Sequence, residues 1–246
     1  VLLGTNERLL YEKDVVLDVL ANLSSDNNDN EYEVIMKEGA PSFVSELLPS
    51  VDSESYALSA VNAAANLACH PGSGEVMIEK NYVFAALNLL KEYEWNAEIV
   101  ETTIDSFNNL SHSNSPAVMG AIVDEGGVQA ILSACQIHFE KIELCEAGLT
   151  TLSMAIRMKR GIKHLMSVDG ASALMKLYEK QKDKTVITMI FKMLSYLGKK
   201  DEYAIIVGQA CIHQVVSAMK DYEDDLVILK AAISTLTHMT LHDGNL

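Results

Sequence analysis

Leucine recurs along this chain at a nearly constant interval, inside segments that have helical hydrophobic spacing. The positions are Leu23, Leu67, Leu110, Leu152, Leu194 and Leu236, which lie 44, 43, 42, 42 and 42 residues apart. Each leucine is followed by serine, alanine or threonine. Because self-similarity at about 40–47 residues is typical of stacked helical repeats, the pattern predicts an α-helical solenoid in which these leucines are buried.

Within each interval the apolar residues predict three helices. A short segment ends at a glycine or a turn, as in YEVIMKEGA (residues 32–40) and GIKHLMSVDG (residues 161–170). A segment of about three turns follows, and then a longer one with apolar residues at i, i+3, i+4 and i+7. We expect these third helices to end near residues 25, 69, 112, 154, 197 and 239. The prediction is an all-α fold of about six three-helix repeats, the first one partial, in a single domain spanning residues 1–246.

Three helices per unit, with glycine between the first two, resemble the armadillo repeat. In that family an asparagine of the third helix points into a concave groove and binds the backbone of an extended peptide. The position before each periodic leucine, called the ladder position here, is Asn22, Asn66, Asn109, Thr151, Met193 and Thr235. The first three match the family and the last three depart from it. The tryptophan that nuclear import receptors carry one turn earlier is absent. The resemblance implies a right-handed armadillo solenoid that binds other proteins.

Residues four and eight positions before each ladder position share its helix face, so they extend the predicted groove. The predicted partner-binding groove consists of Asp18, Asn22, Asn62, Asn66, Glu101, Asp105, Asn109, Glu143, Thr151, Met189, Met193 and Thr235. Its first part is acidic and rich in amides, which suits a basic or backbone-exposing ligand. Its last part is apolar, and flexible methionine adapts to irregular partners. The alternative is a solvated face on which the composition has drifted.

Charge is distributed unevenly along the chain. Residues 157–200 hold 11 Lys or Arg and 3 acids, whereas the rest of the chain holds 8 Lys or Arg and 31 acids. A basic region in an acidic protein is suited to acidic partners or to an anionic membrane surface, although a merely solvated face is the alternative. The predicted basic patch consists of Lys176, Lys180, Lys182, Lys184, Lys199 and Lys200. Nucleic acid is not an expected partner, because the acidic remainder would repel phosphate.

Candidate motifs for chemistry are weak. His238 and His242 have the i, i+4 spacing of two metal ligands, but the glutamate of a zinc-protease motif is not between them, so no metal site is expected. The four cysteines are scattered through apolar segments without a CxxC pair, which predicts buried free thiols. No apolar run approaches the ~18 residues that span a bilayer. We therefore expect a non-catalytic protein without a cofactor.

A chain made almost wholly of such repeats resembles the armadillo-repeats-only proteins of apicomplexan parasites. The Asn- and Asp-rich segment SSDNNDNE (residues 24–31) is in keeping with that resemblance. Members of that family are anchored to the cytosolic face of rhoptry secretory organelles by N-terminal myristate and palmitate. They position the organelle by recruiting an unconventional myosin and an adenylate cyclase. The resemblance implies a cytoplasmic scaffold of this kind, whose membrane contact would lie in an acylated segment before Val1.

Two alternatives stay open at this point. One is a peptide-binding adaptor of the nuclear-transport type, which the acidic groove residues favour and the missing tryptophans disfavour. The other is a regulatory solenoid that senses a small metabolite, which an apolar ligand pocket would support.

Overall fold

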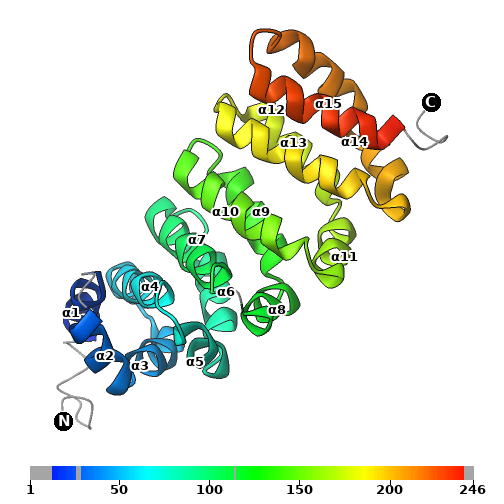
Figure 1. The fold of residues 1–246 in the computed structure, drawn as a ribbon. Coiled ribbons are helices and arrows are strands. Elements are labelled where there is room, and N and C mark those ends of the chain that lie inside the picture. Colours follow the sequence, from blue (N-terminus) through cyan, green and yellow to red (C-terminus); the bar gives the residue numbers. More distant parts are fainter. Residues whose placement is uncertain (1–12, 26–28, 114, 241–246) are drawn as a thin grey trace. The chain divides into compact units, whose positions relative to one another are not determined.

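The computed structural model describes residues 13–25, 29–113 and 115–240, and within these ranges every regular element is a helix (Figure 1). The helices group into two compact units, Val1–Gly127 (unit 1) and Val128–Leu246 (unit 2). The expectation of one continuous domain spanning residues 1–246 stays a prediction.

Unit 1 contains two whole repeats and parts of two others. Its elements are α1 (Lys13–Ser25), α2 (Asp29–Lys37), α3 (Ala40–Leu47), the 3-10 turn η2 (Leu48–Ser50), α4 (Glu54–Ala68), α5 (Ser73–Glu79), α6 (Tyr82–Glu92), α7 (Ala97–Ser111) and α8 (Pro116–Asp124). The third helices α1, α4 and α7 are neighbours, with α4 packed against the other two (Figure 1). Alanines such as Ala60 and Ala64 fill the buried side of α4, so its backbone can approach its neighbours closely.

Unit 2 follows the same plan. Its elements are α9 (Gly127–Ile137), which starts at the boundary, α10 (Ile142–Ala155), α11 (Lys159–Ser167), α12 (Gly170–Lys180), α13 (Lys184–Gly198), α14 (Asp201–Asp221) and α15 (Leu226–Thr240). The third helix α13 packs between α10 and α15. In both units together, the third helices end at Ser25, Ala68, Ser111, Ala155, Gly198 and Thr240, each within one residue of the expected end.

A residue in the left-handed conformation separates the first and second helices of most repeats. These residues are Gly39 (φ 80°), Asn81 (φ 58°), Gly126 (φ 92°) and Asp169 (φ 53°). Glycine adopts this conformation freely, and asparagine and aspartate tolerate it better than other residues do. These residues therefore end the first helix and let the chain turn into the second.

The last repeat differs from the prediction of three helices. Its first two helices are fused into α14, a single helix of 21 residues. Gly208 lies inside α14, and no residue of this helix has a positive φ. A glycine within a helix costs about 1 kcal/mol relative to alanine but does not by itself end the helix. The prediction of three separate helices was wrong for this repeat, because α14 continues through Gly208 without a break.

The burial of the periodic leucines differs between the inner and the terminal repeats. Leu67, Leu110, Leu152 and Leu194 are fully buried, as predicted. Leu23 is 42% exposed and Leu236 is only partly buried, so the expectation that the whole series is buried was wrong at both ends. In a repeat array, each unit buries its apolar face on its neighbours, and a terminal repeat has one neighbour fewer.

Cys135, Cys145 and Cys211 are buried free thiols as predicted, whereas Cys69 is exposed at the end of α4. Within the described ranges, no single helix is both long and apolar enough to cross a membrane, and only the bent pair of α8 and α9 meets that criterion jointly.

Candidate peptide-binding face and basic patch

The predicted groove residues of unit 1 lie on three packed third helices, and all of them reach the surface. Asp18 and Asn22 on α1 are exposed. The other five are partly exposed: Asn62 and Asn66 on α4, and Glu101, Asp105 and Asn109 on α7. Because α4 packs against both α1 and α7, these side chains form one continuous face, called the acidic–amide face here.

Two ladder asparagines connect neighbouring repeats. The Nδ2 of Asn66 donates to the carbonyl of Ala21 at 2.8 Å, and the Nδ2 of Asn109 donates to the carbonyl of Ala65 at 2.9 Å. Each asparagine therefore joins its own third helix to the preceding one. An amide side chain also has a second N–H and a carbonyl oxygen with two lone pairs, so this structural bond leaves capacity for a ligand.

Asp105 is the most perturbed carboxylate of the acidic–amide face. Its half-buried position, followed by the nearby negative charge of Glu101, raises the pKa of Asp105 to about 6. Within the described ranges no cation pairs with it. Although Cys69 as a whole residue is exposed, partial desolvation of its thiol, followed by the charge of Asp105, raises the pKa of that thiol. The ionised form of Asp105 therefore lacks a compensating positive charge.

The corresponding predictions in unit 2 need correction. Glu143 is exposed and Met189 is partly exposed. However, the ladder residues Thr151, Met193 and Thr235 are buried, so their side chains are not available to a ligand.

Hydrogen bonding explains why the two threonines tolerate burial. The hydroxyl of Thr151 donates to the carbonyl of Ala147 at 3.0 Å. The hydroxyl of Thr235 lies 2.8 Å from the carbonyl of Ala231 and 2.9 Å from that of Phe191 on α13. Helical spacing identified the correct ladder positions, but it carries no information on how deeply each one lies.

All six lysines of the predicted basic patch are exposed, namely Lys176, Lys180, Lys182, Lys184, Lys199 and Lys200. Three of them make contacts within unit 2. The Lys184 ammonium forms an ion pair with Asp225 at 2.8 Å. Lys180 lies 5.0 Å from the centroid of the Phe139 ring, and Lys200 lies 5.1 Å from that of Tyr196.

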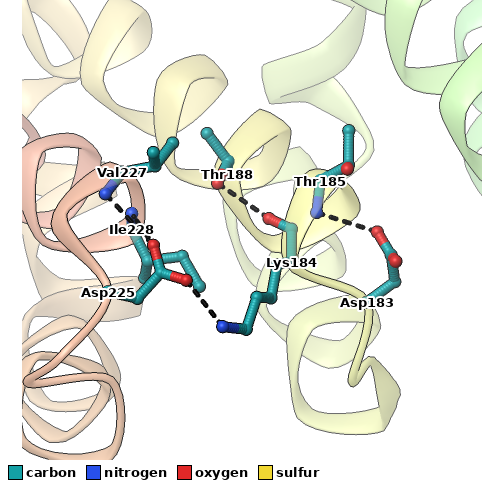
Figure 2. A network of polar contacts seen from close by, with 7 residues as sticks. All are labelled: Asp183, Lys184, Thr185, Thr188, Asp225, Val227 and Ile228. Carbon is teal, nitrogen blue, oxygen red and sulfur yellow. Dashed lines mark hydrogen bonds and ion pairs between the residues drawn. The ribbon is translucent and has the colours of Figure 1, made fainter.

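The ion pair of Lys184 belongs to a capping arrangement shown in Figure 2. Asp183 accepts hydrogen bonds from the backbone N–H groups of Thr185 and Val186 at the start of α13. Asp225 does the same for Val227 and Ile228 at the start of α15, and its second oxygen meets Lys184. The Lys184 hydrogen bond and those backbone donors lower the pKa of Asp225. Lys184 therefore stabilises a helix junction and has less charge to offer a partner.

A small hollow of about 210 Å³ lies between α13 and α15. It is lined by Lys192, Ser195, Tyr196, Lys199, Ala231 and Ser234. The sequence prediction included only Lys199 of this set. Lys192, Ser195, Tyr196 and Lys199 have the spacing i, i+3, i+4 and i+7, which marks one helix face and could have revealed the cluster.

A second hollow, of about 250 Å³, lies in unit 1. Its lining residues include Leu48, Val51, Phe84, Leu89 and Glu92. The Phe84 ring is a large exposed apolar side chain at this hollow. Within the described residues, no group of three or more His, Cys, Asp or Glu side chains is arranged to hold a metal ion.

Known proteins resemble this chain in structure rather than in sequence. Neither the models of protein families nor the curated proteins give a match. A designed armadillo repeat protein superposes with a TM-score of 0.75 at 16% identity, over 97% of this chain and 96% of that one. A second designed armadillo repeat protein, solved in complex with the peptide (KR)4, gives 0.77 at 17% identity over 95% of each chain.

The chain has the armadillo-repeat fold. An engineered protein adds a further match, with a TM-score of 0.76 at 16% identity over 98% of this chain and 96% of that one. Because the sequence identities are only 16–17%, the superpositions establish the armadillo fold alone. The ladder positions expected from the armadillo resemblance lie on the third helices of the repeats.

Proposed function

We propose that the protein is a non-catalytic interaction scaffold whose acidic–amide face binds an extended basic segment of a partner protein. The observation that carries the proposal is Asp105, a half-buried carboxylate with a raised pKa, next to Glu101 and without a paired cation in the described structure. A lysine or arginine of a ligand would supply the missing charge. The ion pair would also offset the unfavourable burial of the carboxylate.

The asparagines supply a second, sequence-independent part of the recognition. Asn66 and Asn109 lie on adjacent third helices and each keeps hydrogen-bonding capacity beyond its inter-repeat bond. Adjacent packed helices are about 10 Å apart, and an extended chain rises about 3.3 Å per residue, so about three ligand residues separate the two amides. An amide can both donate to and accept from a peptide bond, whatever side chains the ligand carries.

One solved structure with the same fold supports this ligand class. The designed armadillo protein described above was solved with (KR)4, a peptide of alternating lysine and arginine. That peptide is therefore a suitable first probe for the acidic–amide face.

The test is a titration of fluorescein-labelled (KR)4 followed by fluorescence anisotropy. We expect Asp105→Asn to weaken binding by roughly 10- to 150-fold, because a charge-assisted hydrogen bond contributes roughly 1.5–3 kcal/mol. The matched control is Asp52→Asn, which removes an exposed carboxylate of unit 1 that is not part of the face. Equal losses in the two variants would show that (KR)4 responds only to the overall negative charge.

A pH series sharpens the same test. Free Asp105 has a pKa of about 6, so it is largely protonated at pH 5 and ionised at pH 7. Binding a cation favours the ionised form and lowers this pKa. Affinity should therefore rise from pH 5 to pH 7, and binding at pH 6 should release protons. Calorimetry in buffers of different ionisation enthalpy measures that release, and Asp105→Asn should abolish most of it.

The cellular role is a separate proposal that rests on the resemblance to armadillo-repeats-only proteins. We propose that the scaffold positions a rhoptry from its cytosolic face by recruiting an unconventional myosin and an adenylate cyclase. Co-purification of a myosin or a cyclase with the tagged protein, together with imaging against a rhoptry marker, tests this role. A location away from that organelle would refute the cellular role and leave the peptide-binding proposal standing.

A further inference from the structure

The hollow between α13 and α15 combines positive charge with hydroxyl groups. Lys192 and Lys199 are exposed at its edge, whereas Ser195 is only 6% exposed. Neither ammonium is in an ion pair with a carboxylate of the described residues. The Lys200 ammonium lies over the Tyr196 ring, so it adds a third positive charge beside the hollow.

The hydroxyls of the hollow are held by a short hydrogen-bond chain. The Nδ1 of His238 lies 2.6 Å from the carbonyl oxygen of Ser234, which can only accept, so Nδ1 carries the hydrogen. The Oγ of Ser195 lies 3.1 Å from the same Nδ1 and 2.8 Å from the Oγ of Ser234. The two serines have two hydroxyl hydrogens between them, and their mutual bond uses one. One hydroxyl hydrogen therefore remains to be donated.

The donors and the positive charge of the hollow therefore call for a ligand that supplies hydrogen-bond acceptors and negative charge. Its lining can offer two ammonium groups, a tyrosine hydroxyl and the remaining serine hydrogen. The C-terminal end of α13 carries partial negative charge of about half an elementary charge, which the two ammonium groups outweigh.

We propose that this hollow binds the phosphoryl group of a phosphorylated serine or threonine in a partner protein. A phosphoryl group carries about −1.5 to −2 charges and three acceptor oxygens, which matches two ammonium groups and several donors. A carboxylate carries one charge and two oxygens, so it would leave part of the lining unpaired. The volume of about 210 Å³ admits such a group at the end of a side chain.

The proposal goes beyond the peptide-binding face of unit 1, because it concerns unit 2 and ligands of opposite charge. Loss of (KR)4 binding would leave it untouched, and its own failure would leave the acidic–amide face untouched. It also distinguishes Lys192 and Lys199 from the other exposed lysines of the same unit.

The test uses a fluorescein-labelled peptide with one phosphoserine flanked by two alanines on each side. Its comparison probes are the same peptide with serine, the same peptide with glutamate, and inorganic phosphate as a competitor. We expect saturable binding of the phosphoserine peptide, binding at least fivefold weaker for the glutamate peptide, and none for the serine peptide. Inorganic phosphate should compete at higher concentration than the unlabelled phosphopeptide.

Two pairs of substitutions separate a defined site from general charge. Lys192→Gln with Lys199→Gln should weaken phosphopeptide binding at least tenfold. The matched control, Lys176→Gln with Lys182→Gln, removes the same charge from exposed positions outside the hollow and should change binding less than twofold. Ser234→Ala provides a second probe and should weaken binding several-fold at unchanged net charge.

Any one of the following results overturns the proposal. These are no binding of the phosphopeptide at about 1 mM, equal losses in the two lysine pairs, or equal affinity for the glutamate peptide. If inorganic phosphate competes as strongly as the unlabelled phosphopeptide, the hollow binds free phosphate, and the proposal of a phosphorylated partner protein is overturned. All variants change exposed or partly exposed side chains, and thermal unfolding checks that they remain folded.

Discussion

Unit 1 and unit 2 use the same repeat position in different ways. In unit 1, the ladder residues Asn66 and Asn109 are partly exposed and each bonds to the preceding third helix through one amide hydrogen. In unit 2, Thr151, Met193 and Thr235 occupy the matching positions and are buried. The longer asparagine side chain can hydrogen-bond to the neighbouring helix and still reach the surface, whereas the shorter threonine side chain makes its hydrogen bonds while buried.

One inter-repeat bond is nevertheless preserved across this difference. The single hydroxyl hydrogen of Thr235 is shared between the carbonyls of Ala231 and Phe191, and the second of these contacts corresponds to the bond that Asn109 donates to Ala65. The threonine oxygen is attached directly to Cβ and the amide nitrogen lies one bond further out. The threonine version therefore requires a closer approach of the two backbones, which fits its complete burial.

The starts of the third helices show a second contrast. In unit 1, the capping residue Asn96 donates to the first-turn carboxylate of Glu54 in the preceding repeat at 3.0 Å. In unit 2, the capping residue Asp225 meets the first-turn ammonium of Lys184 at the same junction (Figure 2). The same contact is thus an amide–carboxylate bond in one unit and an ion pair in the other, so the repeat preserves the junction rather than its chemistry.

The largest expected effect concerns the shared core. Leu110→Ala in unit 1 and Leu152→Ala in unit 2 should each lower the free energy of unfolding by about 2–5 kcal/mol, because both leucines are fully buried. Leu23→Ala should cost much less, because Leu23 is 42% exposed. Urea unfolding measures all three. A cost at Leu23 equal to that at Leu110 would show that the exposed end is covered in solution.

A smaller effect is expected from the ladder bonds. The double change Asn66→Ala with Asn109→Ala should lower the free energy of unfolding by roughly 1–3 kcal/mol, because two inter-repeat hydrogen bonds are lost. Ladder asparagines that served only a ligand would leave it unchanged, so this outcome distinguishes the two roles. Thr235→Val removes the corresponding bond in unit 2 and should cost about half as much in the same unfolding assay.

Asp105→Asn should raise the melting temperature at neutral and alkaline pH, where Asp105 is ionised, and leave it nearly unchanged at pH 4. Burial raises the pKa of Asp105 from its ordinary value to about 6, so the folded state holds its proton more tightly than the unfolded state. Stability is therefore lost as the pH rises from the ordinary aspartate pKa to about 6. The Asn variant should melt at a higher temperature than the parent at pH 8 and at a similar one at pH 4. A lower melting temperature at pH 8 would contradict the half-buried, uncompensated carboxylate.

The smallest effect is expected at the junction ion pair. Lys184→Gln removes the cation that helps to lower the pKa of Asp225, while the backbone caps of α15 remain. A lowered pKa in the folded state stabilises the fold above the ordinary aspartate pKa, and this stabilisation is lost as the pH falls through the lowered pKa. The free energy of unfolding of the variant should therefore depend less on pH in this acidic range. The difference should shrink in 1 M salt, where charges are screened within about 3 Å. Glu54→Gln, at the matching junction of unit 1, should respond less to salt.

Much of this fold could be predicted from spacing. The 42- to 44-residue leucine series and the apolar periodicity located every third helix end to within one residue. The fused helix α14 escaped prediction because a glycine such as Gly208 permits a turn without requiring one. The candidate surfaces were harder still, since helical spacing grouped Asn109 and Met193 as equivalents although only the asparagine reaches the surface.

The sequence by itself determined the repeat, its helices and the composition of the acidic–amide face, because these depend on short-range periodicity and on residue type. Only the tertiary structure decided which ladder residues are buried, which lysines are already engaged, and that Lys192, Ser195 and Ser234 surround one hollow. These properties depend on how residues about 40 positions apart pack against each other. Burial and hydrogen bonding across helices are set by that packing, and local pattern does not contain it.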